Sequence, residues 1–168
     1  MPFVVSAQKR GMVTGYAHPF ERDLQRRVSA ASVEAMSRMI FVNLPVKDLQ
    51  RSVDFFAGLG FEFNAQFTDD NATYMVINDQ AAVMLLVEEF YATFTTKKIA
   101  DATQVSEVLV GVSADSREAA DQLVDTAVGA GATEAGEPMD MGMMYQRAFY
   151  DLDGHKWEII WMDPDFTG

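Results

Sequence analysis

Hydrophobic positions predict a strand and then a helix at the start of the clearly patterned part of the chain. Residues 39–46 form an apolar run rich in β-forming side chains, which predicts a buried strand. The segment that follows has apolar residues at steps of four and three, which is typical of a helix with one buried face. These residues are Leu49, Val53, Phe56 and Leu59. Asp48 stands where a helix N-cap belongs, and Gly58 and Gly60 are expected to end the helix.

Three more strands are expected after this helix. Residues 61–67 alternate apolar with polar side chains, which predicts a half-buried strand. Turn-forming residues at 69–71 and 78–79 separate it from two further strands, expected at 73–77 and 82–87. The first half of the chain therefore predicts a βαβββ unit.

The pattern restarts in the second half. Residues 88–103 lose periodicity and are expected to form a long connecting loop with room for a helical turn. Residues 106–112 predict a strand, and Asp115 with Glu118 three residues later predicts a capping box at the start of a helix. The apolar stripe of this helix is Ala119, Ala120, Leu123, Val124, Ala127 and Val128. The remaining expected strands are 132–135, 143–151 and 156–162.

The two halves repeat the same order of elements. The expected helix caps Asp48 and Asp115 are 67 positions apart, and the glycine pairs that end the helices, at 58–60 and 129–131, are 71 positions apart. One βαβββ unit is too small to close a pocket alone, whereas two can bury a shared core. The repeat therefore predicts an α+β fold in which two tandem βαβββ modules form paired curved mixed sheets around a central cleft.

The domain limits follow from the pattern. We expect one domain at residues 39–164, with module one at 39–88, a linker at 89–104 and module two at 105–164. Residues 1–38 carry a formal charge of +3 within a chain whose net charge is −12, so the rest carries −15. This segment is expected to be an N-terminal extension that is flexible or partly helical. A targeting peptide and a true start at Met39 are the alternatives.

Composition excludes several classes of function. The negative net charge argues against nucleic acid and anionic membranes as partners, since both need clustered Lys and Arg. The chain has no cysteine, which excludes disulfides, thiolate metal sites and cysteine nucleophiles. The two histidines, His18 and His155, are too far apart in sequence for a histidine-rich zinc motif. The absence of cysteine is compatible with a reducing cytosol, and a cytoplasmic protein is expected. No apolar run reaches the roughly 20 residues of a membrane-spanning helix.

One carboxylate near the C-terminus lies in an unusual place. Asp153 and Gly154 predict a tight turn between two strands, and His155, just past the turn, is expected to be exposed to solvent. In the last strand Trp157 and Glu158 face opposite sides, and the next residues on the side of Glu158 are apolar. A carboxylate in such surroundings needs a partner, a metal ion or water.

Two segments resemble a known family. Residues 43–56 (NLPVKDLQRSVDFF) are followed by LGF at 59–61, and residues 151–158 read DLDGHKWE. Within a duplicated βαβββ chain, they make residues 39–164 similar to the vicinal oxygen chelate superfamily, which includes glyoxalase I, bleomycin resistance proteins and extradiol dioxygenases. The resemblance implies a small-molecule ligand in the cleft. It also implies that a homodimer is possible, because modules in this superfamily pair within or between chains.

The resemblance further implies a divalent metal ion held by four side chains, two from each module. The matching positions are Phe41, Leu85, Glu107 and Glu158. Phe41 and Leu85 cannot bind a metal, so the expected site is incomplete. Two carboxylates with water would hold Mg²⁺ or Mn²⁺ weakly, and nickel, zinc or iron are the other ions that the resemblance allows.

Two functions are compatible with these observations. The first is a metal-free protein that binds a small aromatic or amphipathic molecule in an apolar cleft, and the loss of two metal ligands favours it. The second is a divalent-metal-dependent lyase or dioxygenase that uses Glu107 and Glu158 as metal ligands and as catalytic acid and base. For the apolar candidates the alternative is an ordinary core position, and for Glu107 an exposed strand start. Arg147 is expected to pair with Glu107, Glu158 or a ligand carboxylate. The expected ligand-binding residues are Phe41, Phe55, Phe56, Tyr74, Leu85, Met144, Tyr145 and Arg147.

Overall fold

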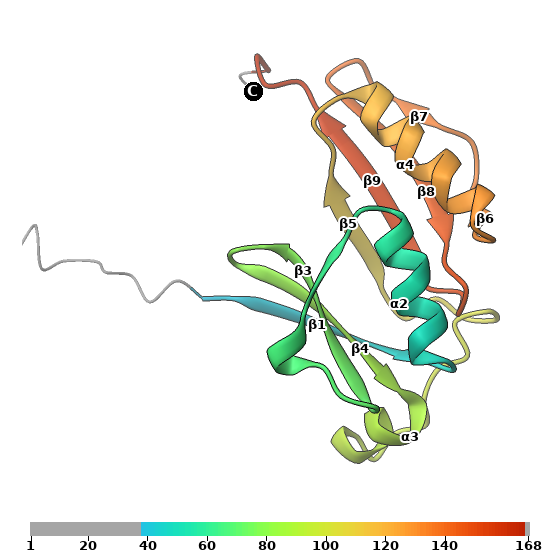
Figure 1. The fold of residues 1–168 in the computed structure, drawn as a ribbon. Coiled ribbons are helices and arrows are strands. Elements are labelled where there is room, and N and C mark those ends of the chain that lie inside the picture. Colours follow the sequence, from blue (N-terminus) through green and yellow to red (C-terminus); the bar gives the residue numbers. More distant parts are fainter. Residues whose placement is uncertain (1–37, 167–168) are drawn as a thin grey trace, which may run out of the picture. The chain divides into compact units, whose positions relative to one another are not determined.

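The computed structural model describes residues 38–166, so the expected N-terminal extension, apart from Arg38, lies outside the described residues. The described part contains two mixed sheets, each accompanied by a helix (Figure 1). The strands of the first sheet are β1 (Ile40–Val46), β2 (Glu62–Asn64), β3 (Ala72–Asn78) and β4 (Ala81–Val87). They are ordered β1-β4-β3-β2, and β1 runs parallel to β4 while the other pairs are antiparallel.

The second sheet repeats this arrangement. Its strands are β5 (Leu109–Ser113), β6 (Thr133–Glu134), β7 (Met139–Asp140), β8 (Met144–Tyr150) and β9 (Lys156–Met162). The order is β5-β9-β8-β6 with β7 also on β8, and β5 runs parallel to β9. The fold predicted from the internal repeat is thus confirmed: the chain is α+β, with two βαβββ-like mixed sheets.

One helix follows the first strand of each sheet, and each helix begins at a side-chain N-cap. Helix α2 (Leu49–Gly58) is capped by Asp48, whose carboxylate accepts from Arg51 N at 3.0 Å, as predicted. Helix α4 (Arg117–Gly129) is capped by Ser116, whose hydroxyl accepts from Ala119 N at 3.1 Å. The predicted cap at Asp115 is therefore wrong by one residue, because Ser116 is an equally good cap type.

Other elements of the structure differ in length from those that the sequence predicts. The strand expected at 61–67 ends at Asn64, because the Asn64 side chain accepts from Gln66 N at 2.9 Å and starts a 3₁₀ turn. The expected loop after β4 contains helix α3 (Glu88–Tyr91) and a second 3₁₀ turn (Ala92–Phe94). Within residues 38–166, no helix is long and apolar enough to cross a membrane.

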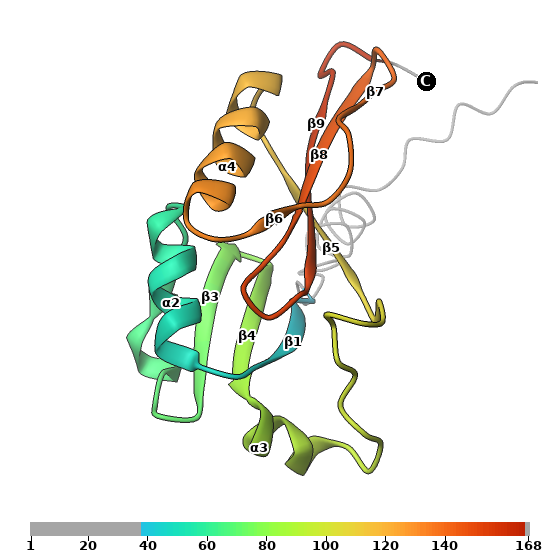
Figure 2. The same ribbon diagram turned by 90° about the vertical axis from the view of Figure 1, so that its right-hand side faces the viewer.

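Figure 2 shows both helices on the same side of the strands. The strand faces toward the helices carry the fully buried side chains, and the opposite faces are only partly covered. The buried set from both sheets and both helices includes Leu44, Val46, Met75, Val83, Leu85, Phe56, Val124, Phe149, Trp157 and Ile159. At roughly 1.5–3 kcal/mol for each large apolar side chain, this shared core is the main source of stability.

Helix α2 belongs to the first module but also packs on the second sheet. The ring of Phe56 lies 4.8 Å from that of Trp157, and the ring of Phe55 lies 6.2 Å from that of Phe149. Aromatic pairs of this kind contribute about 0.5–1.5 kcal/mol each beyond the area they bury. The two modules therefore share one core through α2.

The turn between β8 and β9 approaches the linker so closely that only glycine fits at its tip. Gly154 has φ of +97°, and a Cβ there would lie 2.7 Å from Thr103 N and 2.8 Å from Ala102 C. Gly136 has the same φ, but a Cβ there would have no neighbour within 4 Å. Comparing Gly154 with Gly136 therefore separates the free-energy cost of the positive φ from the cost of the steric contact with the linker.

Replacing Gly154 by alanine is expected to destabilise the protein more than Gly136→Ala. Both variants strain the backbone by about 1–2 kcal/mol, but only G154A also forces the linker away, which adds about 1–3 kcal/mol. Urea unfolding of both variants measures the difference. Equal losses of free energy would mean that the linker does not hold its position against the turn.

Candidate functional site

The turn that connects β8 to β9 is stabilised from within by the buried carboxylate of Asp151. Its Oδ1 accepts from the backbone N–H groups of Asp153 at 3.0 Å and His155 at 2.9 Å, and its Oδ2 accepts from the indole N–H of Trp157 at 3.0 Å. Burial raises the pKa of Asp151, and the interaction with His155 together with these three hydrogen bonds opposes the rise. The carboxylate thus joins the turn to the core of the second module.

Asp153 connects the same turn to the first module. Its carboxylate accepts from Lys47 N at 3.1 Å and from the hydroxyl of Ser52 at 3.1 Å, next to the start of α2. Arg51 reaches across as well, donating to Leu152 O at 2.7 Å, and lies 3.9 Å from Asp153 Oδ1. The turn therefore carries a set of polar contacts that cross from one module to the other.

His155 is a third contact between the modules, and the expectation that it is exposed is wrong. Only 3% of its surface is accessible. Its Nε2 lies 2.7 Å from Pro45 O. A carbonyl oxygen only accepts, so Nε2 must carry the hydrogen and donate. This contact joins residues that are 110 positions apart, which is why the sequence around the turn did not reveal it.

The other ring nitrogen of His155 faces Glu107. Nδ1 lies 3.6 Å from Glu107 Oε1, which is too long for a hydrogen bond, and it is buried with no hydrogen-bond partner within the described part of the chain. Glu107 is partly accessible, with 26% of its side-chain surface exposed. The pair therefore consists of one buried ring nitrogen and one carboxylate that solvent can reach.

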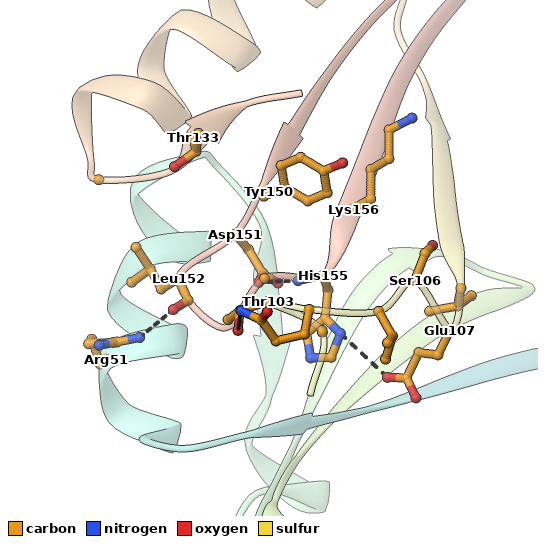
Figure 3. Close-up of a pocket in the computed structure, with 16 residues that line it drawn as sticks. Arg51, Thr103, Ser106, Glu107, Thr133, Tyr150, Asp151, Leu152, His155 and Lys156 are labelled. Atoms are coloured by element: carbon orange, nitrogen blue, oxygen red, sulfur yellow. Dashed lines mark hydrogen bonds and ion pairs between the residues drawn. The ribbon is translucent and has the colours of Figure 1, made fainter. Parts of the chain in front are cut away.

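A pocket of about 580 Å³ lies beside this turn. The walls come from residues 102–108 before β5, from Arg51 of α2, from the turn itself, and from the ends of β6, β8 and β9 (Figure 3). Polar groups line it together with apolar surface from Val105, Val108 and Leu152. The polar lining is Arg51, Thr103, Gln104, Ser106, Glu107, Thr133, Tyr150, Asp151, His155 and Lys156. A smaller pocket of about 260 Å³ lies on the Pro45 side of the same histidine.

The comparisons with known proteins agree with this architecture. A model of the glyoxalase/bleomycin resistance protein/dioxygenase superfamily matches residues 38–159, which is most of the chain. The chain belongs to this superfamily. No functionally curated protein matches it significantly.

Solved structures show the same superfamily fold. The chain is similar to a hypothetical protein from S. aureus at 27% identity, covering 80% of this chain and 98% of that one with a TM-score of 0.62. It is also similar to a superfamily enzyme from Burkholderia phytofirmans, at 21% identity over 73% and 96% of the two chains with a TM-score of 0.61. A glyoxalase-related enzyme from Fulvimarina pelagi is 16% identical over 74% and 87%, with a TM-score of 0.64. The last two show the fold alone.

The metal positions implied by the superfamily resemblance do not form a donor set in this chain. Glu158 lies 3.1 Å from the ammonium of Lys156, which precedes it on the same strand face and supplies the partner that its apolar surroundings require. Glu158 is in register with Gly111. Gly111 is four residues beyond Glu107, and four residues of extended chain span about 13 Å. Across residues 38–166 no group of three or more His, Asp or Glu could hold a metal ion. These residues do not fit a resident divalent ion.

Phe41 and Leu85 lie on opposite faces of the first sheet. Phe41 is 49% exposed on the uncovered face, where its ring is 6.0 Å from that of Tyr74. Leu85 is fully buried on the helix side. Ala82 of β4 pairs with Phe41 and shares its face of the sheet. Leu85 is three residues beyond Ala82, and side chains an odd number of positions apart in a strand point to opposite faces. Phe55 and Phe56 are also core residues. Of these four, only Phe41 remains on an open surface.

The expected ligand-binding residues of β8 divide between its two faces. Tyr145 and Arg147 face α4, where Tyr145 donates to Asp121 at 2.7 Å. Arg147 pairs with Asp125 at 2.7 Å and Glu134 at 2.6 Å, and the expected pairing with Glu107 or Glu158 is wrong. Burial lowers the pKa of Arg147, but hydrogen bonds to Glu134 and Asp125 outweigh it and raise the pKa.

Met144 lies on the other face of β8, in register with Met162 of β9. Among the expected site residues, Glu107 is the one that lines the 580 Å³ pocket. Sequence analysis missed Tyr150, Thr133 and Lys156. The spacing of Lys156 and Glu158 on one strand face was the available signal for their pairing.

Protein purified without chelator is expected to contain far less than one equivalent of divalent metal. The positions implied for ligands carry apolar groups, or carboxylates with other partners, so EDTA should leave the unfolding temperature unchanged. Elemental analysis by mass spectrometry and a thermal scan with and without EDTA measure both quantities. Stoichiometric metal that disappears in the Glu158→Gln variant would contradict this account of the site.

Proposed function

We propose that this protein binds a small organic molecule in the 580 Å³ pocket, without a resident metal ion. The pocket itself is the observation that carries the proposal. Its volume is within the range of about 300–1,000 Å³ that is usual for small-molecule sites. Its lining comes from the linker, from module two and from Arg51 of module one.

The lining favours an amphipathic molecule with an apolar body and few polar groups. Val105, Val108 and Leu152 offer apolar surface, and Tyr150 adds an aromatic ring. Hydroxyl groups of Ser106 and Thr133 stand among them. This combination favours binding of a small aromatic or aliphatic compound that carries hydrogen-bonding substituents, in keeping with the first of the two functions compatible with the sequence.

The turn that forms the wall between the pocket and the core is held in one conformation. Asp151 stabilises the turn by three hydrogen bonds, and Gly154 packs against the linker without room for a methyl group. A wall of this kind loses little conformational entropy when a ligand binds, which favours affinity. The protein therefore needs no metal ion to shape the site.

Benzyl alcohol is a suitable neutral probe, and it is expected to shift the amide resonances of residues 102–108 and 150–156 in a ¹H–¹⁵N NMR titration. Thr133→Trp should reduce these shifts, because the indole would occupy part of the pocket. Thr126→Trp, on the exposed side of α4, is the matched control and should leave them intact. Shifts that map to other residues, or that survive Thr133→Trp, would contradict binding in this pocket.

A further inference from the structure

A group of methionines lies at the end of the second sheet, on surface that the proposed pocket does not use. Met139, Met141 and Met162 expose 51%, 58% and 63% of their surfaces, and Met144 is half-buried. None of the four lines the 580 Å³ pocket. Core packing therefore does not explain why the three exposed positions carry thioethers.

The four side chains lie on the face of the sheet that is turned away from helix α4. Arg117 of α4 lies over the rings of Tyr145 and Trp161, 5.2 and 4.8 Å from their centroids. It also pairs with Asp140. These three partners of Arg117 are thus on the α4 side. Successive side chains in a strand face opposite ways, so the methionines adjacent to these partners are on the other face.

Strand register puts three of the methionines in one row across the sheet. Met144 of β8 is directly opposite Met162 of β9. On its other side, Met141 N donates to Met144 O at 2.8 Å, which continues the pairing of β7 with β8 by one residue. Side chains directly opposite each other have Cβ atoms about 4.5–5.5 Å apart. We call Met141, Met144 and Met162 the methionine row.

Neighbouring thioethers are a ligand set for a soft metal ion. Thioether sulfur selects Cu(I), whereas Mg²⁺ and Ca²⁺ prefer oxygen ligands. The methionine side chain is unbranched and flexible, so sulfurs from adjacent strands can converge on one ion. The chain has no cysteine that would compete for such an ion, and its net charge of −12 attracts cations.

We propose that the methionine row binds a soft monovalent metal ion, Cu(I) or its chemical analogue Ag(I), through its thioether sulfurs. The site goes beyond the proposed function, because the row contributes nothing to the pocket lining. Arg117 supports it by donating to Gly142 O at 2.7 Å, which stabilises the turn between Met141 and Met144. It also differs from a divalent site, for which the described residues offer no group of three or more His, Asp or Glu.

Silver nitrate in chloride-free buffer is the probe, because Ag(I) keeps its oxidation state in air. A ¹H–¹³C NMR titration of the full chain follows the methyl groups of the methionines. Ag(I) is expected to shift the methyls of the methionine row together, along one binding curve that ends at one equivalent. The methyl of Met75, which is fully buried in the core, should not shift. Mg²⁺ at the same concentrations should shift none of them.

Leucine substitutions test whether the sulfurs act as one site. Met144→Leu removes the central thioether at nearly constant volume and should weaken Ag(I) binding by about tenfold or more. Met162→Leu should have the same effect at an exposed position, where folding depends less on the side chain. Met84→Leu is the matched control, because Met84 is half-buried like Met144 but belongs to β4 of the first sheet. The unfolding temperature of each variant shows whether it is folded.

Three results would overturn the proposal. The first is that stoichiometric Ag(I) leaves the three methyls unshifted, as it would if a second copy of the chain covered this face. The second is that each methyl follows its own binding curve, which would mean independent thioethers and no shared site. The third is an affinity for Ag(I) that Met144→Leu and Met162→Leu leave unchanged.

Discussion

The turn at residues 151–155 joins the two modules by polar contacts. Asp151 joins the turn to Trp157 in the core of the second module, and Asp153 joins it to Ser52 at the start of α2. His155 adds the contact to Pro45 in β1. Because the turn has polar contacts to both modules and forms one wall of the pocket, the shape of the candidate site follows from the way in which the modules are joined.

The same contacts account for the difference between this chain and the metal site that the superfamily resemblance implies. Glu107 faces His155, and Glu158 faces Lys156, so each carboxylate has a neighbour other than a metal ion. Phe41 and Leu85 add no donor atoms, and they lie on opposite faces of their sheet. The superfamily fold is retained, and we propose the pocket beside the turn as the ligand site of this chain.

The sequence was sufficient to predict the fold, because hydrophobic periodicity and the repeated cap and glycine positions depend on local physics. Asp48 and the glycine at the end of α2 are of this kind. It was insufficient for the candidate site. The burial of His155 depends on Pro45, 110 positions away, and the orientation of Arg147 depends on acidic residues of α4 and β6. Alternation along β4 also puts Leu85 on the covered face, which a motif position alone does not reveal.

The most direct test of the central claim, that this turn makes the two modules one cooperative unit, is urea unfolding followed by two probes. Fluorescence reports on the second module, because both tryptophans of the chain, Trp157 and Trp161, lie in β9. Far-ultraviolet circular dichroism reports on both modules. The account predicts coincident transitions in the wild-type protein, and a common shift to lower urea in Asp153→Asn, where the amide would face a donor from Lys47 N or Ser52. Two separate transitions in the wild-type protein would contradict it.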